Sequence, residues 1–170
     1  GGTPQTAEKA GSLGIKMAIA ILGGSPERFQ PLAECYRRAG MANGYTSNEL
    51  RIAITSHGYI ARTSEQALND LYPYYLNYFN AIMSQSGNPY KLSRSDFEQF
   101  VAPDNALAVG TPEQIIEKIL YQHELFGHTR FMAQMDIGGL PYAKVASAIE
   151  LLATEVAPVV RKEIARRNKG

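Results

Sequence analysis

The spacing of apolar residues between positions 109 and 141 predicts one helix followed by one strand. Apolar residues recur from Ile115 to Phe126 at intervals close to the helical period of 3.6 residues. After Gly127, which is a suitable helix stop, apolar residues occupy every second position over residues 131–137. This alternation is typical of a strand with two different faces. The stretch is therefore expected to form a helix–strand unit that ends in a glycine pair.

The beginning of the chain repeats this unit. Thr111 is a good N-cap and Pro112 suits the first helical turn, and the same Gly-Thr-Pro sequence stands at positions 2–4. There it precedes a helical segment, a glycine, the apolar stretch 15–22 and a second glycine pair. A strand that follows a helix and leads into another helix is typical of a parallel sheet covered by helices. We therefore predict an α/β fold.

Further segments continue the alternation of helices and strands. Ser25 is expected to cap a helix that ends at Gly40, and residues 50–61 alternate strictly enough to form a strand. A last helix is predicted to begin at Pro141, and Pro158 is expected to bend or restart it.

The periodicity weakens over residues 62–108. Thr63 is expected to start a helix with clustered tyrosine and phenylalanine residues, which Pro73 would break or kink. Beyond it, a short helix capped by Ser95 is expected within residues 85–108. We interpret 62–108 as a helical insertion or lid, with 85–108 as a mobile excursion, because binding loops usually have this character.

Composition and charge exclude several classes of protein. With 45% apolar residues, the 170 residues are expected to form one globular domain over residues 1–170. The 17 Lys and Arg residues against 16 Asp and Glu give no field that would attract nucleic acid. We found no metal-ligand pattern, no apolar run of roughly 18 residues and no signal-peptide layout. A cytoplasmic protein without nucleic-acid or membrane partners is therefore expected.

The order of elements matches the second half of an eight-stranded (β/α)8 barrel, provided that a strand precedes Gly1. Four linked stretches, at residues 1–40, 50–63, 109–119 and 149–164, together resemble the C-terminal half of the bacterial luciferase-like flavin-dependent monooxygenases. The resemblance extends over nearly all of the chain, but the family is about twice as long. The resemblance thus implies a C-terminal half-barrel.

The resemblance also implies a cofactor site. In the family, the Gly-Gly-Thr turn after the fifth strand helps to bind the phosphate of reduced FMN, and this turn corresponds to Gly1, Gly2 and Thr3. Exposed amides at a helix N-terminus and a threonine hydroxyl suit an anion. The alternative is a plain helix cap. The second copy, at residues 110–112, is expected not to face the barrel mouth.

Two residues are candidates for a substrate pocket. His57 lies near the carboxyl end of its predicted strand, where barrels place their chemistry, and Gln134 lies on the less apolar face of the last strand. The alternatives are a hydrogen-bonded histidine at the barrel rim and an internal polar link. Because the catalytic histidine of some family members belongs to the absent half, the catalytic residues of this chain are unknown.

The implied parent enzyme uses reduced FMN and dioxygen to oxidise a small organic substrate, with a flavin reductase as a supplier of reduced flavin. A deazaflavin-dependent oxidoreductase of the same barrel is the alternative. A third possibility is a non-catalytic half-barrel that binds a flavin or phosphate. In each case the chain alone is expected to be incomplete as a catalyst and to associate with the missing N-terminal half or with a second copy.

Overall fold

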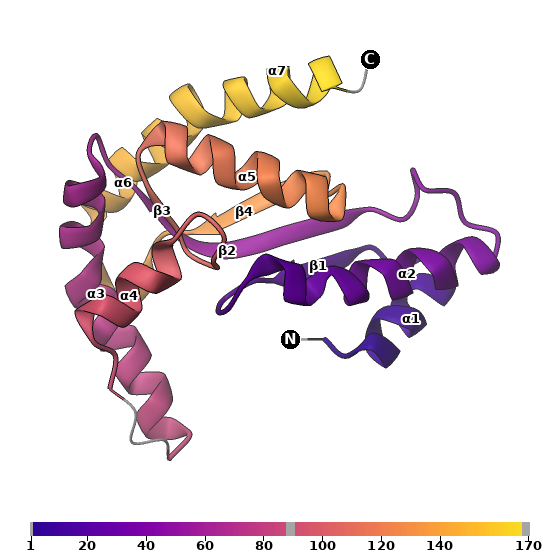
Figure 1. The fold of residues 1–170 in the computed structure, drawn as a ribbon, viewed down its shortest axis with the longest axis horizontal. Coiled ribbons are helices and arrows are strands. Elements are labelled where there is room, and N and C mark those ends of the chain that lie inside the picture. Colours follow the sequence, from indigo (N-terminus) through magenta and orange to yellow (C-terminus); the bar gives the residue numbers. More distant parts are fainter. Residues whose placement is uncertain (1, 88–90, 168–170) are drawn as a thin grey trace.

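The computed structural model describes residues 2–87 and 91–167. Helices and strands alternate along most of the chain (Figure 1). The elements are α1 (Pro4–Ser12), β1 (Met17–Ala20), η1 (Pro26–Phe29), α2 (Gln30–Ala42), β2 (Ile52–Ile60), α3 (Ser64–Gln85), α4 (Arg94–Val101), β3 (Ala108–Gly110), α5 (Pro112–Phe126), β4 (Arg130–Gln134), η2 (Ile137–Gly139), α6 (Tyr142–Leu151), the π-helical η3 (Leu152–Val156) and α7 (Ala157–Arg167).

The sheet is organised around β2, which pairs in parallel with each of the other strands described. β1 pairs with residues 52–55 of β2, β4 with residues 53–57 and β3 with residues 58–60. Because all pairs are parallel, the loops that follow the strands lie at one end of the sheet. The predicted α/β architecture with a parallel sheet is confirmed.

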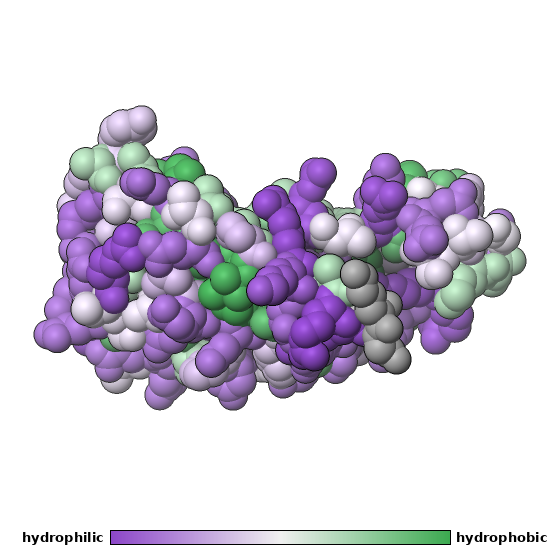
Figure 2. Space-filling model, turned by 90° about the horizontal axis from the view of Figure 1, so that it is seen from above, coloured by the Kyte–Doolittle hydropathy of each residue, from purple (hydrophilic) through white to green (hydrophobic). Residues whose placement is uncertain are grey.

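Two apolar clusters hold the helices against the sheet. In one, Ile21 and Ile54 pack with Tyr36 of α2 and Phe126 of α5, and all four side chains are fully buried or nearly so. The other joins α3, α4 and α5 to the carboxyl half of β2 and includes Phe97. Burying a side chain of this size stabilises a fold by roughly 1.5–3 kcal/mol. The outer face with α5 and α7 is mainly hydrophilic, with smaller apolar areas (Figure 2).

The structure corrects the prediction of the chain between α4 and α5. Residues 108–110 form the short strand β3, which the sequence pattern had not indicated because three apolar residues carry no periodicity. The cap of α4 is Ser93, not Ser95. Ser93 and Asp96 form a reciprocal capping box, in which each side chain binds the other residue's backbone N–H.

Two prolines have less effect on their helices than expected. α3 continues through Pro73 without interruption, which corrects the predicted break. Asn69, whose carbonyl loses its donor, and Pro73 are both exposed, so water can replace the missing bond. Before Pro158, the helix that begins with α6 widens into the π-helical turn η3 and then continues as α7. Here the proline is accommodated by a local change of helix type.

The capping predictions near the strands have mixed outcomes. The hydroxyl of Thr63 accepts a hydrogen bond of 3.1 Å from the backbone N–H of Gln66, which confirms it as the cap of α3. Ser25 stands at the N-cap position of the 3-10 turn η1, before α2, and its side chain makes no cap hydrogen bond, which corrects that prediction. α2 extends past Gly40 to Ala42, and Gly40 instead lies against Leu50, where a Cβ would come within 2.4 Å.

α3 crosses the end of the sheet at which the strands finish. Gly138 of η2 lies so close to α3 that a Cβ on it would be 1.8 Å from the carbonyl oxygen of Tyr74. α4 packs on α3 through Phe97, which is fully buried. Within the described ranges, no helix is both long and apolar enough to cross a membrane. The interpretation of residues 62–108 as a lid stays a prediction.

Candidate functional site at the carboxyl ends of the strands

The predicted phosphate site lies at the amino end of α1. The hydroxyl of Thr3 accepts a hydrogen bond of 3.2 Å from the backbone N–H of Thr6, and the two threonine hydroxyls are 3.0 Å apart. Their mutual bond uses one hydroxyl proton, so the other can bind an anion. Gly2 and Thr3 are exposed, and a Cβ on Gly2 would contact nothing within 4 Å. These donors fit a phosphate, whereas Gly1 lies outside the described residues.

Gly2 also connects this turn to the sheet. It lines a cavity of about 150 Å³ together with residues 17–20, which form β1, and with Phe29 of η1. The candidate phosphate site therefore lies beside strand β1 of the sheet.

The second Gly-Thr-Pro turn follows β3 and so lies at the same end of the sheet as the carboxyl end of β2, contrary to the expectation that it faces away. Its donors are satisfied internally. The N–H of Thr111 donates to Oε1 of Gln114 over 2.9 Å, and the N–H of Gln114 donates back to the Thr111 hydroxyl over 3.4 Å. A Cβ on Gly110 would lie 2.4 Å from the same Oε1. This turn is closed as a helix cap.

His57 is buried on β2, with 2% of its surface exposed. Its Nε2 lies 3.4 Å from the hydroxyl of Tyr78, and its ring meets those of Tyr75 and Tyr78 edge to face at centroid distances of 5.9 and 4.9 Å. Among the described residues, Nδ1 has no hydrogen-bond partner. Burial lowers the pKa of His57, so the ring is neutral at pH 7.

Gln134 is the register partner of His57 on the neighbouring strand β4. Its side chain is exposed and lines an open groove of about 430 Å³ with Thr55 and Met132. The structure thus brings the two predicted pocket positions together in the sheet but gives their side chains different environments. Their role in a substrate pocket stays a prediction.

A polar network at the same end of the sheet was not predicted from the sequence. The hydroxyl of Tyr59 on β2 donates to Asp70 of α3 over 3.0 Å, and Lys144 of α6 forms an ion pair with the same carboxylate. Burial, followed by the bond to Asp70, raises the pKa of Tyr59. Burial opposes ionisation of Asp70, but the bonds from Lys144 and Tyr59 hold its pKa below the usual value. The network ties three elements together.

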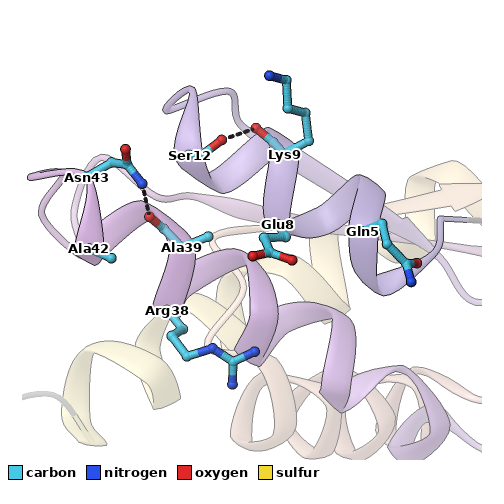
Figure 3. Close-up of a pocket in the computed structure, with 8 residues that line it drawn as sticks. All are labelled: Gln5, Glu8, Lys9, Ser12, Arg38, Ala39, Ala42 and Asn43. Atoms are coloured by element: carbon cyan, nitrogen blue, oxygen red, sulfur yellow. Dashed lines mark hydrogen bonds between the residues drawn. The ribbon is translucent and has the colours of Figure 1, made fainter.

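Outside this end of the sheet, a groove of about 550 Å³ lies between α1 and α2 (Figure 3). It is lined by Gln5, Glu8, Lys9, Ser12, Arg38, Ala39, Ala42 and Asn43. Most of these side chains are exposed, and Lys9 extends away from α2 (Figure 3), so the groove has no buried polar group that would fix a ligand. In the described parts of the chain, no three His, Cys, Asp or Glu side chains are placed to hold a metal ion.

The sequence model of the luciferase-like monooxygenase family matches residues 1–129. The chain therefore belongs to the luciferase-like monooxygenase family, as its motifs indicated. Comparison with curated proteins gave no match.

Solved structures of similar fold agree with a half-barrel. A monooxygenase from Streptomyces bottropensis is 24% identical with a TM-score of 0.74, covering 92% of this chain and 45% of its own. The oxygenating constituent of 3,6-diketocamphane monooxygenase from Pseudomonas putida, in complex with FMN, is 22% identical with a TM-score of 0.64. This match covers 90% of the present chain and 45% of the monooxygenase chain. The coenzyme F420-dependent tetrahydromethanopterin reductase from Methanopyrus kandleri is 16% identical with a TM-score of 0.62. This match covers 93% of the present chain and 49% of the reductase chain. The chain thus spans about half of these relatives.

Proposed function

We propose that this chain is the C-terminal half of a flavin-dependent monooxygenase whose parent oxidises a small organic substrate with reduced FMN and dioxygen. The observation that carries the proposal is the exposed turn at Gly2 and Thr3, which lies beside β1 at the start of α1, in a chain of the luciferase-like family. A flavin reductase is the expected supplier of reduced flavin. Bound reduced flavin would supply the electrons that activate dioxygen.

The residues of this chain have binding and shaping roles in the proposal. Gly2 and Thr3 hold the cofactor phosphate through close approach and hydrogen bonding. His57 is neutral and buried in contact with Tyr78. It forms part of the wall of the substrate pocket and excludes water from it. Gln134 presents an amide that can orient a polar group of the substrate.

A deazaflavin is the second candidate cofactor, because similar structures include F420-dependent enzymes, namely the reductase described above and a secondary alcohol dehydrogenase with an F420-acetone adduct. In that case the parent would be an oxidoreductase without oxygen chemistry. The same phosphate turn would serve either cofactor, so the turn does not discriminate between them.

The test replaces Thr3 with Val in the complete parent protein and titrates FMN and coenzyme F420 in parallel. Losing one hydrogen bond to a charged group costs roughly 1.5 kcal/mol, so the affinity for the true cofactor should fall about tenfold. Thr111→Val is the matched control, since its turn is closed by Gln114, and should leave that affinity unchanged. Tight FMN binding supports the monooxygenase, and tight F420 binding supports the alternative. Unchanged affinity for both cofactors in Thr3→Val would contradict the phosphate assignment.

A further inference from the structure

The loop that joins α4 to β3 closes around a buried lysine of α5. Lys118 is 5% exposed. Its ammonium group donates hydrogen bonds of 2.6–3.1 Å to four backbone carbonyl oxygens, those of Val101, Ala102, Asn105 and Leu107. Because an ammonium group has three protons, these acceptors occupy all of its donors. The four oxygens form a carbonyl cage in the loop, and the group inside the cage comes from a different element.

The caged group is charged at pH 7. Burial lowers the pKa of Lys118 to about 8, and the nearby charge of Asp104 opposes this shift. Carbonyl oxygens favour the ammonium form because they accept hydrogen bonds and cannot donate them. Two of the four oxygens also belong to the end of a helix, since Val101 is the last residue of α4 and Ala102 is its C-cap. A cation is favourable there because the carboxyl end of a helix carries partial negative charge.

The carbonyl cage lies directly before β3. Leu107, which contributes one of its oxygens, is fully buried and precedes Ala108, the first residue of β3. Ala108 is the register partner of Gly58 on β2, and His57 is the residue before Gly58. The ammonium group therefore fixes the segment that leads into the pairing of β3 with the carboxyl end of β2.

We propose that the carbonyl cage is a binding site for a primary ammonium ion, that Lys118 fills it from α5, and that filling it holds β3 against the carboxyl end of β2. Lys118 is thus a positioning residue for the part of β2 that carries His57. A carbonyl group that loses its donor away from water is costly, so removal of the cation favours a loop that opens to water. The cage does not include Gly2 or Thr3, so the proposal and the cofactor assignment can fail separately.

Chemical rescue tests the ammonium site. Lys118→Ala removes the side chain beyond Cβ, and n-propylammonium has the atoms that are removed, whereas 1-propanol is its neutral counterpart. In the variant at pH 7, the amide hydrogen of Ala61, which bonds to the carbonyl of Gly110 on β3, should exchange roughly tenfold faster than in the unmodified chain. A probe this small is expected to bind with a Kd on the order of 10 mM.

Added n-propylammonium should therefore restore the slow exchange at Ala61, and 1-propanol should not, because it cannot supply the charge-assisted hydrogen bonds. The Cε1 proton signal of His57 should move in Lys118→Ala and return with n-propylammonium. Unchanged exchange at Ala61 in the folded variant, equal effects of the two probes, or no effect of either would overturn the proposal.

A control variant and a measurement on the unmodified chain complete the test. Glu117→Ala changes an exposed residue next to Lys118 on α5 and should leave the exchange at Ala61 unchanged, with or without the probes. In the unmodified chain, the ammonium protons of Lys118 should exchange with water more slowly than those of Lys9, which is exposed. Nitrogen–proton correlation spectra of the lysine ammonium groups measure this difference. Equal exchange at Lys118 and Lys9 would overturn the site even if Lys118→Ala does not fold.

Discussion

Nε2 of His57 on β2 lies 3.4 Å from the hydroxyl of Tyr78 on α3, so the helix that follows the strand folds back over its carboxyl half. The imidazole of His57 is buried against the ring of Tyr78, and no charged side chain among the described residues pairs with it. Since burial disfavours the charged form, the ring should resist protonation.

The first prediction follows from this environment. In an NMR titration, the Cε1 proton of His57 should have a midpoint below the ordinary value of about 6.5. Tyr78→Phe removes the hydrogen bond but keeps the ring over the imidazole, so the midpoint should stay below 6.5 in this variant too. A midpoint at or above 6.5 in the unmodified chain would show that His57 is solvated.

The sequence indicated the position of His57 but not its partner. Strand alternation and the (β/α) order are local patterns, and they located β2 and the carboxyl end at which His57 lies. The contact with Tyr78 depends on how α3 returns across the sheet, a nonlocal property. One signal was available, because Tyr75 and Tyr78 are three residues apart and so share a helix face.

The errors in the fold have a similar origin. Ser93 and Ser95 each precede an acidic residue by three positions, so both satisfy the capping pattern, and only the structure shows that the capping box forms at Ser93. The strand β3 is too short to show a period, and its pairing with β2 alone reveals it. The predicted orientation of the second Gly-Thr-Pro turn is wrong because the turn follows β3, a strand that the sequence pattern does not reveal.

The second prediction concerns acid stability. His128 is 3% exposed, and burial, followed by the charge of His123, lowers its pKa to about 4. In the unfolded chain the pKa of His128 is near 6.5. Between pH 6.5 and 4, the imidazole is therefore protonated in the unfolded chain but largely neutral in the folded chain. The free energy of unfolding should keep its full contribution from His128 above pH 6.5 and should be about 2 kcal/mol lower at pH 5. Urea unfolding of His128→Asn should show a smaller loss over this interval, and an identical loss would contradict the assignment.

A third prediction compares the two glycines after β4. Gly138 and Gly139 both have positive φ, at 66° and 83°, so alanine at either site carries strain of roughly 1–2 kcal/mol. Only at Gly138 would the Cβ collide with the Tyr74 carbonyl, whereas at Gly139 it meets nothing within 4 Å. Thermal unfolding should therefore show a much larger fall in Tm for Gly138→Ala than for Gly139→Ala. Equal falls would mean that α3 is not held against η2.

The last prediction concerns the open edge of the sheet. β4 pairs only with β2 among the described strands, and beside it Met132 and Ile149 are 38% and 51% exposed. Unpaired backbone groups next to exposed apolar side chains recruit another strand. In sedimentation velocity, the 170-residue chain should associate with itself at micromolar concentrations, and an added N-terminal half should replace that contact. Met132→Lys should make the chain monomeric, because an edge lysine opposes strand addition. Ile82→Lys, on α3 with similar exposure, is the control and should not change the assembly. If both variants sediment alike, the open edge of β4 does not drive association.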